Sequence, residues 1–317
     1  MKRSIIILHF LILGLSGCKE FKEHEGGMLY KFCEDREGET IKEDDFVAIT
    51  FTERTEEDSI LSSSYGANNN LTLMFRDRSQ FQGDLFAALG LLSEGDSAVF
   101  KINIDSLVAK TGKVRPETKA KHLIYTIKVN HVVSRGNLND SMYNSRIESL
   151  KKAVTDKAKE NEPEILRRYI ASKSLKPAVT KSGLNYVIMK QGEGVRAAPG
   201  DSVVVVYTGR YLNGQVFDTC DSTVAVKHGI YHPSREYGPV TLPVVPEVSS
   251  GFQEALMLFP KGTEVMLILP SKLFYGADGH NSEPPYTPLT CEVKIVDIIH
   301  KNRPELITPL VGTRYQK

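Results

Sequence analysis

The fold is decided by the stretch Val203-Val-Val-Val-Tyr207-Thr-Gly209-Arg-Tyr-Leu-Asn-Gly214-Gln-Val-Phe217-Asp218-Thr219. Its four valines predict a buried strand, because β-branched side chains pack well on a pleated surface. Asn213 and Gly214 predict a tight turn, since both residues accept positive φ at low cost. The second short strand ends in Phe217 and Asp218. A carboxylate beside an aromatic at a strand end needs a partner, and the Tyr207 hydroxyl is a candidate donor.

Further motifs lie on both sides of this stretch. Those before it are Thr180-Lys-Ser-Gly183-Leu184-Asn-Tyr186, Gln191-Gly192-Glu193-Gly194 and Pro199-Gly200-Asp201. Those after it are Gly251-Phe252-Gln253-Glu254-Ala255-Leu256, Lys261-Gly262, Phe274-Tyr275-Gly276-Ala277 and the loop from Gly279-His280 to Pro284-Pro285. In order and spacing, residues 180–300 resemble the FKBP-type peptidyl-prolyl cis-trans isomerases, in the bacterial branch of the macrophage infectivity potentiator. The resemblance implies an α+β fold, in which a curved antiparallel sheet wraps a short helix.

The composition allows two domains and argues against some partners. The chain has 317 residues, long enough to bury two cores. Its 40 basic and 39 acidic residues leave a formal net charge of +1. This balance argues against nucleic acid as a partner. No long apolar run follows the N-terminus, so we expect no membrane-spanning helix there.

The N-terminus predicts a lipid anchor. Lys2-Arg3 precedes an apolar run from Ile5 to Leu15, and Leu15-Ser16-Gly17-Cys18 matches the bacterial lipobox. We therefore expect a signal peptide over residues 1–18, lipidation of Cys18 and a short tether over 19–27. The alternative is a secretory peptide with a chance cysteine. The anchor predicts a cell-envelope location, on the periplasmic face or the outer-membrane surface.

Cysteine and histidine spacing predicts no metal site. Cys33, Cys220 and Cys291 would remain after processing, an odd number without a CxxC pair or Cys/His ligand spacing. Cys220 and Cys291 could pair in an oxidising compartment, but we favour their interpretation as small buried hydrophobic residues. His228 and His232 lack a carboxylate constellation. We expect neither a metal nor another cofactor.

The chain also repeats itself. Four stretches of the second half align with earlier ones: Asp45–Arg54 with Asp201–Arg210, residues 59–63 with 215–219, Leu85–Leu89 with Phe252–Leu256, and Leu123–Val129 with Leu289–Ile295. Residues 28–134 are therefore predicted to be a divergent FKBP-like domain. The isomerase domain is predicted over 179–301, and a C-terminal tail over 302–317.

The first copy lacks the polar groups of the second. Phe51 stands where the second copy has Tyr207, and Ser62 where it has Asp218. Val108 and Ala109 correspond to Tyr275 and its following glycine. We interpret the first copy as a fold without the active site, and favour a packing or spacer role over an independent binding module.

Residues 135–178 are predicted to form a helical linker. Asn139 to Ser141 offers N-caps, and Ile147, Leu150 and Val154 form an apolar stripe. A second helix is expected to start near Pro163, since proline is tolerated in a first turn. Similar proteins carry helices before the isomerase domain that can mediate dimers, so a homodimer through the linker is a hypothesis that the sequence itself does not establish.

The resemblance assigns the site residues. Asp218, Tyr275 and Tyr207 are expected to be catalytic. Six residues are expected to bind substrate: Phe217, Val248, Ser249, Phe252, His280 and Cys291. Ser249 and Cys291 depart from the family, which usually has isoleucine and phenylalanine there. The segment 221–239 is longer than its counterpart and could reshape the pocket mouth, although the sequence leaves its role open.

Peptidyl-prolyl isomerisation of exported proteins, assisting their folding at the envelope, is the predicted function. A dry aromatic pocket favours the twisted amide over the solvated planar one, so no nucleophile or cofactor is required. The alternative is a chaperone-like lipoprotein that binds proline-containing or unfolded segments with little or no turnover. A purely structural surface lipoprotein leaves the acid of the second copy unexplained. Aggregation suppression without proline-dependent catalysis would favour the binding protein.

Overall fold

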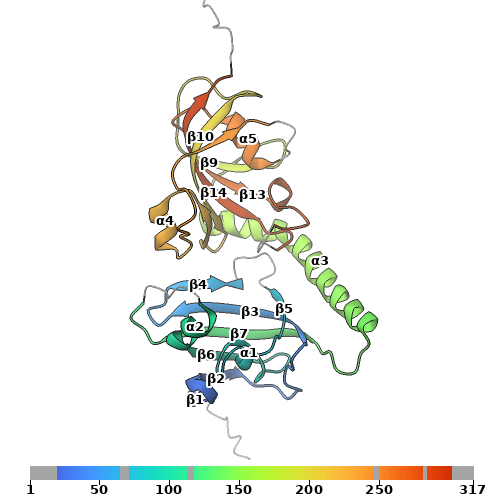
Figure 1. Ribbon diagram of the computed structural model, residues 1–317. Helices are drawn as coiled ribbons and strands as arrows, with labels where there is room; N and C mark the ends of the chain where they lie inside the picture. The colour runs from blue at the N-terminus through green and yellow to red at the C-terminus, as the bar shows by residue number, and fades with distance from the viewer. Residues whose placement is uncertain (1–19, 65–70, 113–117, 246–249, 281–283, 302–317) are drawn as a thin grey trace, which may run out of the picture. The chain divides into compact units, whose positions relative to one another are not determined.

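A computed structural model describes residues 20–64, 71–112, 118–245, 250–280 and 284–301 (Figure 1). By contacts, the chain divides into two compact units. One holds the residues up to 59 together with 74–135, and the other holds 60–73 and the residues from 136 onward. Because residues 60–63 and 72–73 belong to strands of the first sheet, they are described with that sheet as part of the first domain. The two domains, each named by its sheet, are described separately. The predicted α+β class with two antiparallel sheets is confirmed, whereas the predicted domain boundaries stay predictions.

The first sheet has seven strands. They are β1 (Lys22–Glu23), β2 (Leu29–Glu34), β3 (Phe46–Thr55), β4 (Ile60–Ser63), β5 (Thr72–Phe75), β6 (Ser97–Asn103) and β7 (His122–Val133). Their order is β1-β2-β6-β7-β3-β4, and β5 also pairs with β3. The helices are α1 (Leu85–Leu89) and α2 (Ile104–Thr111), with a 3-10 turn η1 (Glu25–Gly27).

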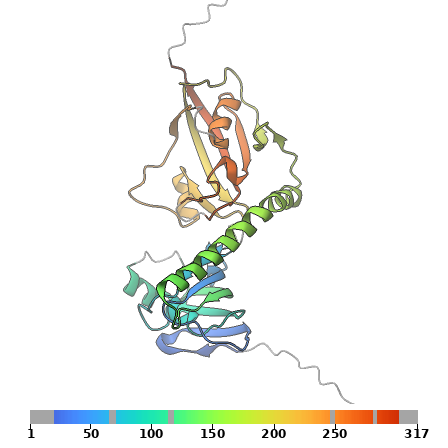
Figure 2. The ribbon, with the colours of Figure 1, turned by 90° about the vertical axis from the view of Figure 1, so that its right-hand side faces the viewer.

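The second sheet also has seven strands. They are β8 (Ala178–Val179), β9 (Asn185–Lys190), β10 (Ser202–Tyr211), β11 (Val216–Thr219), β12 (Val240–Pro243), β13 (Glu264–Leu269) and β14 (Leu289–Ile299). Their order is β11-β10-β14-β13-β9-β8, and β12 also pairs with β10. The helices are α4 (Ser222–Lys227) and α5 (Gly251–Leu258), with a 3-10 turn η3 (Ser271–Leu273). Figure 2 shows α5 lying against this sheet.

The two sheets share one topology. Each strand of the first has a counterpart in the same position of the second, so that β3 matches β10 and β7 matches β14. The register shifts at matching places, between Ala48 and Ile49 and between Val204 and Val205. The internal repeat predicted from the sequence is thus present in the backbone pairing.

An aspartate at the start of the long strand performs the same task in both copies. The Asp45 carboxylate accepts hydrogen bonds from the Lys42 and Arg135 amides, at 2.8 and 2.7 Å. The Asp201 carboxylate accepts from the Ala198 and Lys301 amides, at 2.9 and 3.1 Å. Each buried carboxylate therefore joins the turn before its strand to the end of the last strand, which satisfies its hydrogen-bonding requirement.

The segment expected to be a tether is partly folded. Lys22 and Glu23 pair with Tyr30 and Leu29 as an edge strand, and η1 follows directly. Met28 is fully buried. The prediction of a tether over 19–27 is therefore wrong for residues 22–27, because these residues add a short hairpin to the first sheet. Cys18, with the predicted signal peptide, lies outside the described residues.

The linker contains one continuous helix, α3 (Asp140–Ser172), with Pro163 inside it. The prediction of a second helix starting near Pro163 is wrong. Proline removes one backbone N–H donor, and here the 33-residue helix continues past it. Asn139 caps the start, as predicted, by accepting a hydrogen bond from the Met142 amide at 2.9 Å.

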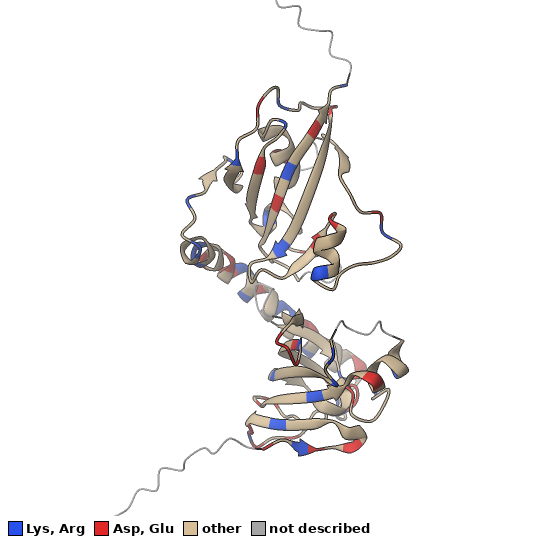
Figure 3. Cartoon of the chain, turned by 90° about the vertical axis from the view of Figure 1, so that its left-hand side faces the viewer, with Lys and Arg blue, Asp and Glu red and all other residues tan. Residues whose placement is uncertain are grey.

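Charges of both signs alternate along the strands and along α3 in the view of Figure 3. This mixture agrees with the formal net charge of +1. Among the residues that the structure describes, no helix has both the length and the apolar character needed to cross a bilayer.

Candidate active site

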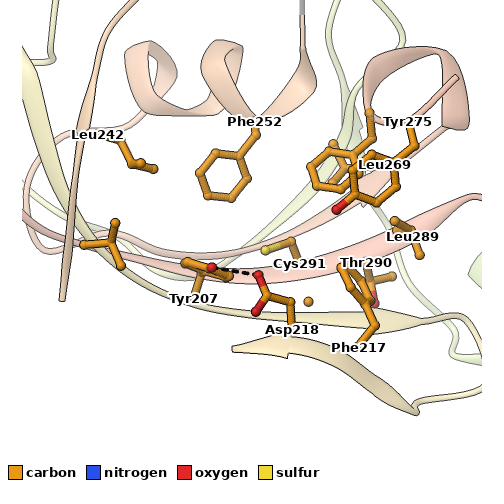
Figure 4. Close-up of a pocket in the computed structure, with 13 residues that line it drawn as sticks. Tyr207, Phe217, Asp218, Leu242, Phe252, Leu269, Tyr275, Leu289, Thr290 and Cys291 are labelled. Carbon is orange, nitrogen blue, oxygen red and sulfur yellow. Dashed lines mark hydrogen bonds between the residues drawn. The ribbon is translucent and has the colours of Figure 1, made fainter. Parts of the chain in front are cut away.

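The second domain carries an apolar cavity of about 240 Å³ between its sheet, α5 and the turn after η3 (Figure 4). Residues from seven segments line it: Tyr207 and Gly209 of β10, Phe217 and Asp218 of β11, Val240 and Leu242 of β12, Phe252 of α5, Leu269 of β13, Phe274 and Tyr275 after η3, and Leu289, Thr290 and Cys291 of β14. Drug-sized ligands usually occupy about 300–1,000 Å³, so this cavity suits one side chain rather than a large molecule.

Strand alternation explains why β10 supplies both core and pocket residues. Val203 and Val205 are fully buried in the core of the second domain. Tyr207 and Gly209 follow at the same period of two and therefore point to the same face. The same face of β10 thus contributes core residues in its first half and pocket residues in its second half.

Gly209 allows the closest packing in the pocket. A Cβ atom at this position would lie 2.6 Å from Cζ of Phe217. The Phe217 ring therefore lies directly over the β10 backbone. The absence of a side chain at Gly209 is required here by close approach and not by positive φ.

Asp218 stands at the pocket rim within a polar network. The Tyr207 hydroxyl donates a hydrogen bond to its carboxylate at 2.7 Å, as the sequence predicted. Arg235 forms an ion pair with the same carboxylate at 2.5 Å and donates a second hydrogen bond to the Tyr207 hydroxyl oxygen at 3.2 Å. The side chains of Asp218 and Arg235 are 32% and 38% exposed, so solvent screens this pair.

This network affects the protonation of its members. Burial, followed by the hydrogen bond to Asp218, raises the pKa of Tyr207 above its usual range. The hydrogen bond to Asp218 likewise raises the pKa of Arg235. The hydroxyl therefore stays protonated at neutral pH and keeps the carboxylate in place.

Aromatic rings form the remaining walls. Tyr207 and Phe252 meet edge to face with centroids 6.0 Å apart, and Phe217 and Tyr275 do so at 6.5 Å. The Tyr275 hydroxyl points into the pocket in Figure 4. His280 stacks on the Tyr275 ring at 4.9 Å.

The structure brings most of the predicted residues together. Six of them line the one cavity: Tyr207, Phe217, Asp218, Phe252, Tyr275 and Cys291. His280 does not line it, but lies against a residue that does. Val248 and Ser249 fall outside the described residues. The roles assigned to all of these residues stay predictions.

Both cysteines of this domain are free and buried. Cys291 lines the cavity, where burial raises the pKa of its thiol. The Cys220 sulfur accepts a hydrogen bond from the Tyr207 amide at 3.1 Å. The disulfide left open by the sequence is absent, and the favoured interpretation of buried hydrophobic residues agrees with the structure. Among the described residues, no group of three or more His, Cys, Asp or Glu side chains could hold a metal ion.

Sequence reasoning missed Arg235 and several aliphatic wall residues. Leu269 of β13 pairs with Leu289 of β14. Because side chains alternate along a strand, Leu289 lies on the same face as Cys291, and this period of two could have predicted that both residues line the cavity. Arg235 had no such signal, because it lies 17 residues after Asp218 in an irregular segment. Arg235 belongs to the segment 221–239, whose role the sequence left open, and it contacts Asp218 and Tyr207 at the pocket rim.

Comparison with known proteins gives the family of this domain. Residues 193–296 match the family model described as FKBP-type peptidyl-prolyl cis-trans isomerase. The second domain is therefore an FKBP-type domain.

Several bacterial proteins are similar to this half of the chain. The FKBP-type peptidyl-prolyl cis-trans isomerase FkpA of Aeromonas hydrophila is 33% identical over 158 residues, which are 49% of this chain and 54% of the relative. The 22 kDa FKBP-type isomerase of Escherichia coli is 35% identical over 135 residues, 42% of this chain and 59% of the relative. The outer membrane protein MIP of Legionella longbeachae is 32% identical over 139 residues, 43% of this chain and 51% of the relative. The chain thus spans somewhat more than half the length of these relatives.

One solved structure that matches the chain is FkpA from Escherichia coli. The match has a TM-score of 0.35 and 23% sequence identity, and it covers 51% of this chain and 74% of that chain.

Proposed function

We propose that the second domain is a peptidyl-prolyl cis-trans isomerase that acts on X–Pro bonds of exported proteins. The observation that carries this proposal is the apolar cavity with one carboxylate held at its rim by Tyr207 and Arg235. The match to the FKBP-type family over residues 193–296 supports it. The first domain has a spacer role in this proposal.

The chemistry follows from the properties of the amide bond. Rotation about a peptide bond crosses a barrier of about 18–20 kcal/mol, because resonance is lost in the twisted form. The twisted carbonyl is less polar than the planar one. A cavity walled by Phe217, Phe252 and Leu269 therefore binds the twisted form better than water does, which is the differential binding that accelerates a reaction.

Two polar groups orient the substrate in this mechanism. Asp218 lies beside the carbonyl that precedes proline, and its ion pair with Arg235 keeps it from repelling the carbonyl oxygen as an isolated anion would. Tyr275 donates a hydrogen bond from its inward-pointing hydroxyl to a substrate carbonyl. No proton is transferred and no covalent bond is made. His280 supports the Tyr275 ring from outside the cavity.

A lipid on Cys18 would anchor the protein at the cell envelope, where exported proteins fold. The lipobox at Leu15 to Cys18 supports this part of the proposal. A relative named as an outer membrane protein also supports it. A homodimer through the linker has less support, because Ile147 and Val154 of its apolar stripe are buried in the single chain.

The test is cis/trans isomerisation of a short X–Pro peptide by the full-length chain. We expect acceleration, and a fall of about ten- to a hundredfold in kcat/KM for Asp218→Ala, since hydrogen bonds to charged groups contribute about 1.5–3 kcal/mol. Ser62→Ala, at the matching position of the first domain, is the control and should leave kcat/KM unchanged.

The outcomes separate the two functions. No acceleration by a chain shown to be folded, together with suppression of aggregation of an unfolded protein, would replace the isomerase with the chaperone-like binding protein. Loss of cooperative unfolding in Asp218→Ala would make the acid a structural residue.

A further inference from the structure

One face of α3 lies against the part of the second domain that forms the pocket wall. Lys159, Glu162 and Tyr169 are three and seven residues apart, so they share one side of the helix. Each contacts a different segment around the pocket. These contacts all lie within the unit that holds α3 and the second sheet.

Glu162 makes the most specific of these contacts. Its Oε1 accepts a hydrogen bond from the Ser271 amide at 2.5 Å, and its Oε2 accepts one from the Ser271 hydroxyl at 2.8 Å. Ser271 is only 1% exposed. Both donors of this buried residue are thus satisfied by one carboxylate that lies 109 residues earlier in the chain. Charge-assisted hydrogen bonds of this kind are about twice as strong as neutral ones.

Ser271 in turn fixes the backbone around Tyr275. Its carbonyl oxygen accepts hydrogen bonds from the amides of Phe274 and Gly276, each at 2.8 Å. These two residues bracket Tyr275 in the sequence. Glu162 is therefore linked through Ser271 to Phe274 and Gly276, the two residues that flank Tyr275 in the sequence. The hydroxyl of Tyr275 is the one that points into the pocket (Figure 4).

The other two residues of this face contact the far sides of the same region. Lys159 Nζ lies 5.9 Å from the centroid of the Tyr286 ring, and the Tyr286 amide donates to the Gly276 carbonyl at 2.9 Å. The Tyr169 side chain lies close to Thr290, which lines the cavity. The helix thus contacts Ser271, at the start of the turn 271–276 that is here called the Tyr275 loop, and Tyr286, which is hydrogen-bonded to its end. It also lies close to Thr290 of β14.

We propose that Glu162 is a positioning residue for the pocket, and that it acts through Ser271 to hold Tyr275 in the orientation that the substrate requires. This proposal rests on the isomerase function proposed above. The second half of α3 is then a part of the active site and more than a connection between domains. A displacement of about 1 Å at a reacting centre can lower a rate by about a hundredfold, so a backbone support of this kind has a measurable effect.

The test uses the full-length chain and three variants. Glu162→Ala removes both acceptors. Glu162→Gln keeps an acceptor for the Ser271 amide and offers its own N–H donor to the Ser271 hydroxyl. Glu160→Ala changes an exposed acid on the same helix and is the matched control.

The first measurement is amide hydrogen exchange, which needs no catalytic activity. In Glu162→Ala we expect the Phe274 and Gly276 amides to exchange about tenfold faster, with β10 amides unchanged. Glu162→Gln and Glu160→Ala should match the unsubstituted chain. Unchanged exchange at Phe274 and Gly276 in Glu162→Ala would overturn the proposal, and so would an equal loss of protection in β10, which would make Glu162 a general stability residue.

The second measurement is kcat/KM for an X–Pro peptide. We expect a fall of about tenfold in Glu162→Ala, recovery in Glu162→Gln and no change in Glu160→Ala. Faster exchange with unchanged kcat/KM would overturn the positioning role. Absence of isomerisation by the unsubstituted chain would instead overturn the proposed function, and the exchange measurement would still decide whether Glu162 supports the Tyr275 loop.

Discussion

The two domains have the same sheet topology, but at one matching cross-strand pair the second domain has small side chains and the first has large ones. In the second domain Gly209 pairs with Cys291 across β10 and β14, and both residues line the cavity. In the first domain the matching pair across β3 and β7 is Glu53 and Tyr125. The Tyr125 hydroxyl donates to Glu53 at 2.7 Å, and Tyr125 is only 6% exposed. A large hydrogen-bonded side chain thus stands where the second domain is hollow.

This difference shows which residues carry the fold and which carry the pocket. The buried aspartates, the register shift and the strand order are common to both copies. The residues that face the cavity are not. The residues that set the strand order are therefore distinct from the residues that line the cavity of the second domain.

Filling the second cavity should have the largest effect. Cys291→Tyr places the first domain's aromatic side chain into a space of about 240 Å³. We expect kcat/KM to fall by about a hundredfold or more, because the substrate can no longer adopt its bound position. Cys291→Ser, which is close to isosteric, is the control in the same peptide assay. Activity within twofold of the unsubstituted chain in Cys291→Tyr would show that isomerisation occurs elsewhere.

Adding one methyl group beneath Phe217 should have the next largest effect. In Gly209→Ala the new Cβ lies too close to the Phe217 ring, so the ring must move and narrow the cavity. We expect a drop of about tenfold in kcat/KM and a lower melting temperature, since overpacking a core costs about 1–3 kcal/mol.

The relief of this clash provides the matched variant. Leu61 of the first domain aligns with Phe217, and the double variant Gly209→Ala/Phe217→Leu should recover the melting temperature without recovering activity. A double variant that is no more stable than Gly209→Ala alone would contradict the clash as the cause.

Removing the buried Tyr125 hydroxyl of the first domain should lower the free energy of unfolding of that domain and leave isomerisation unchanged. Burial raises the pKa of Tyr125 far above its usual range, and the group donates to the Glu53 carboxylate. Tyr125→Phe should destabilise the first domain by about 1.5–3 kcal/mol, the contribution of a hydrogen bond to a charged group. Native-state hydrogen exchange of β7 amides measures this loss, with β14 amides as the internal reference. A parallel fall in isomerisation would contradict the spacer role of the first domain.

Restoring one acid to the first domain should have no effect. In the background Asp218→Ala, we expect Ser62→Asp to leave isomerisation at the residual level. Phe51 has no hydroxyl to hold the new carboxylate, and Tyr125 occupies the matching cavity position. Recovery of peptide isomerisation in this double variant would show that the first domain has retained a working pocket.

Local patterns in the sequence predicted the central strands and turn of the fold, whereas the resemblance to the FKBP-type isomerases supplied most of the pocket residues. The valine strand, the turn at Gly214 and the repeat near Asp45 and Asp201 all depend on neighbouring residues, so a single sequence contains their signals. Strand alternation explains why Tyr207 meets Asp218 at 2.7 Å.

The missed features depend on the path of the chain. Arg235 reaches Asp218 only because an irregular segment returns to the pocket rim. Glu162 meets Ser271 across 109 positions, and no periodicity indicates such a pair. Local propensity predicts a helix start near Pro163, although the packed helix continues through this residue.

The short edge strand β1 would limit the distance between the first domain and a membrane that holds a lipid on Cys18. Residues 22 and 23 are already paired with β2, so a lipid on Cys18, as proposed, leaves only residues 19–21 between the bilayer and the folded first domain. Three extended residues span about 10 Å. The folded first domain would then lie within about 10 Å of the lipid headgroups. Its surface, and not a long flexible linker, would face the membrane.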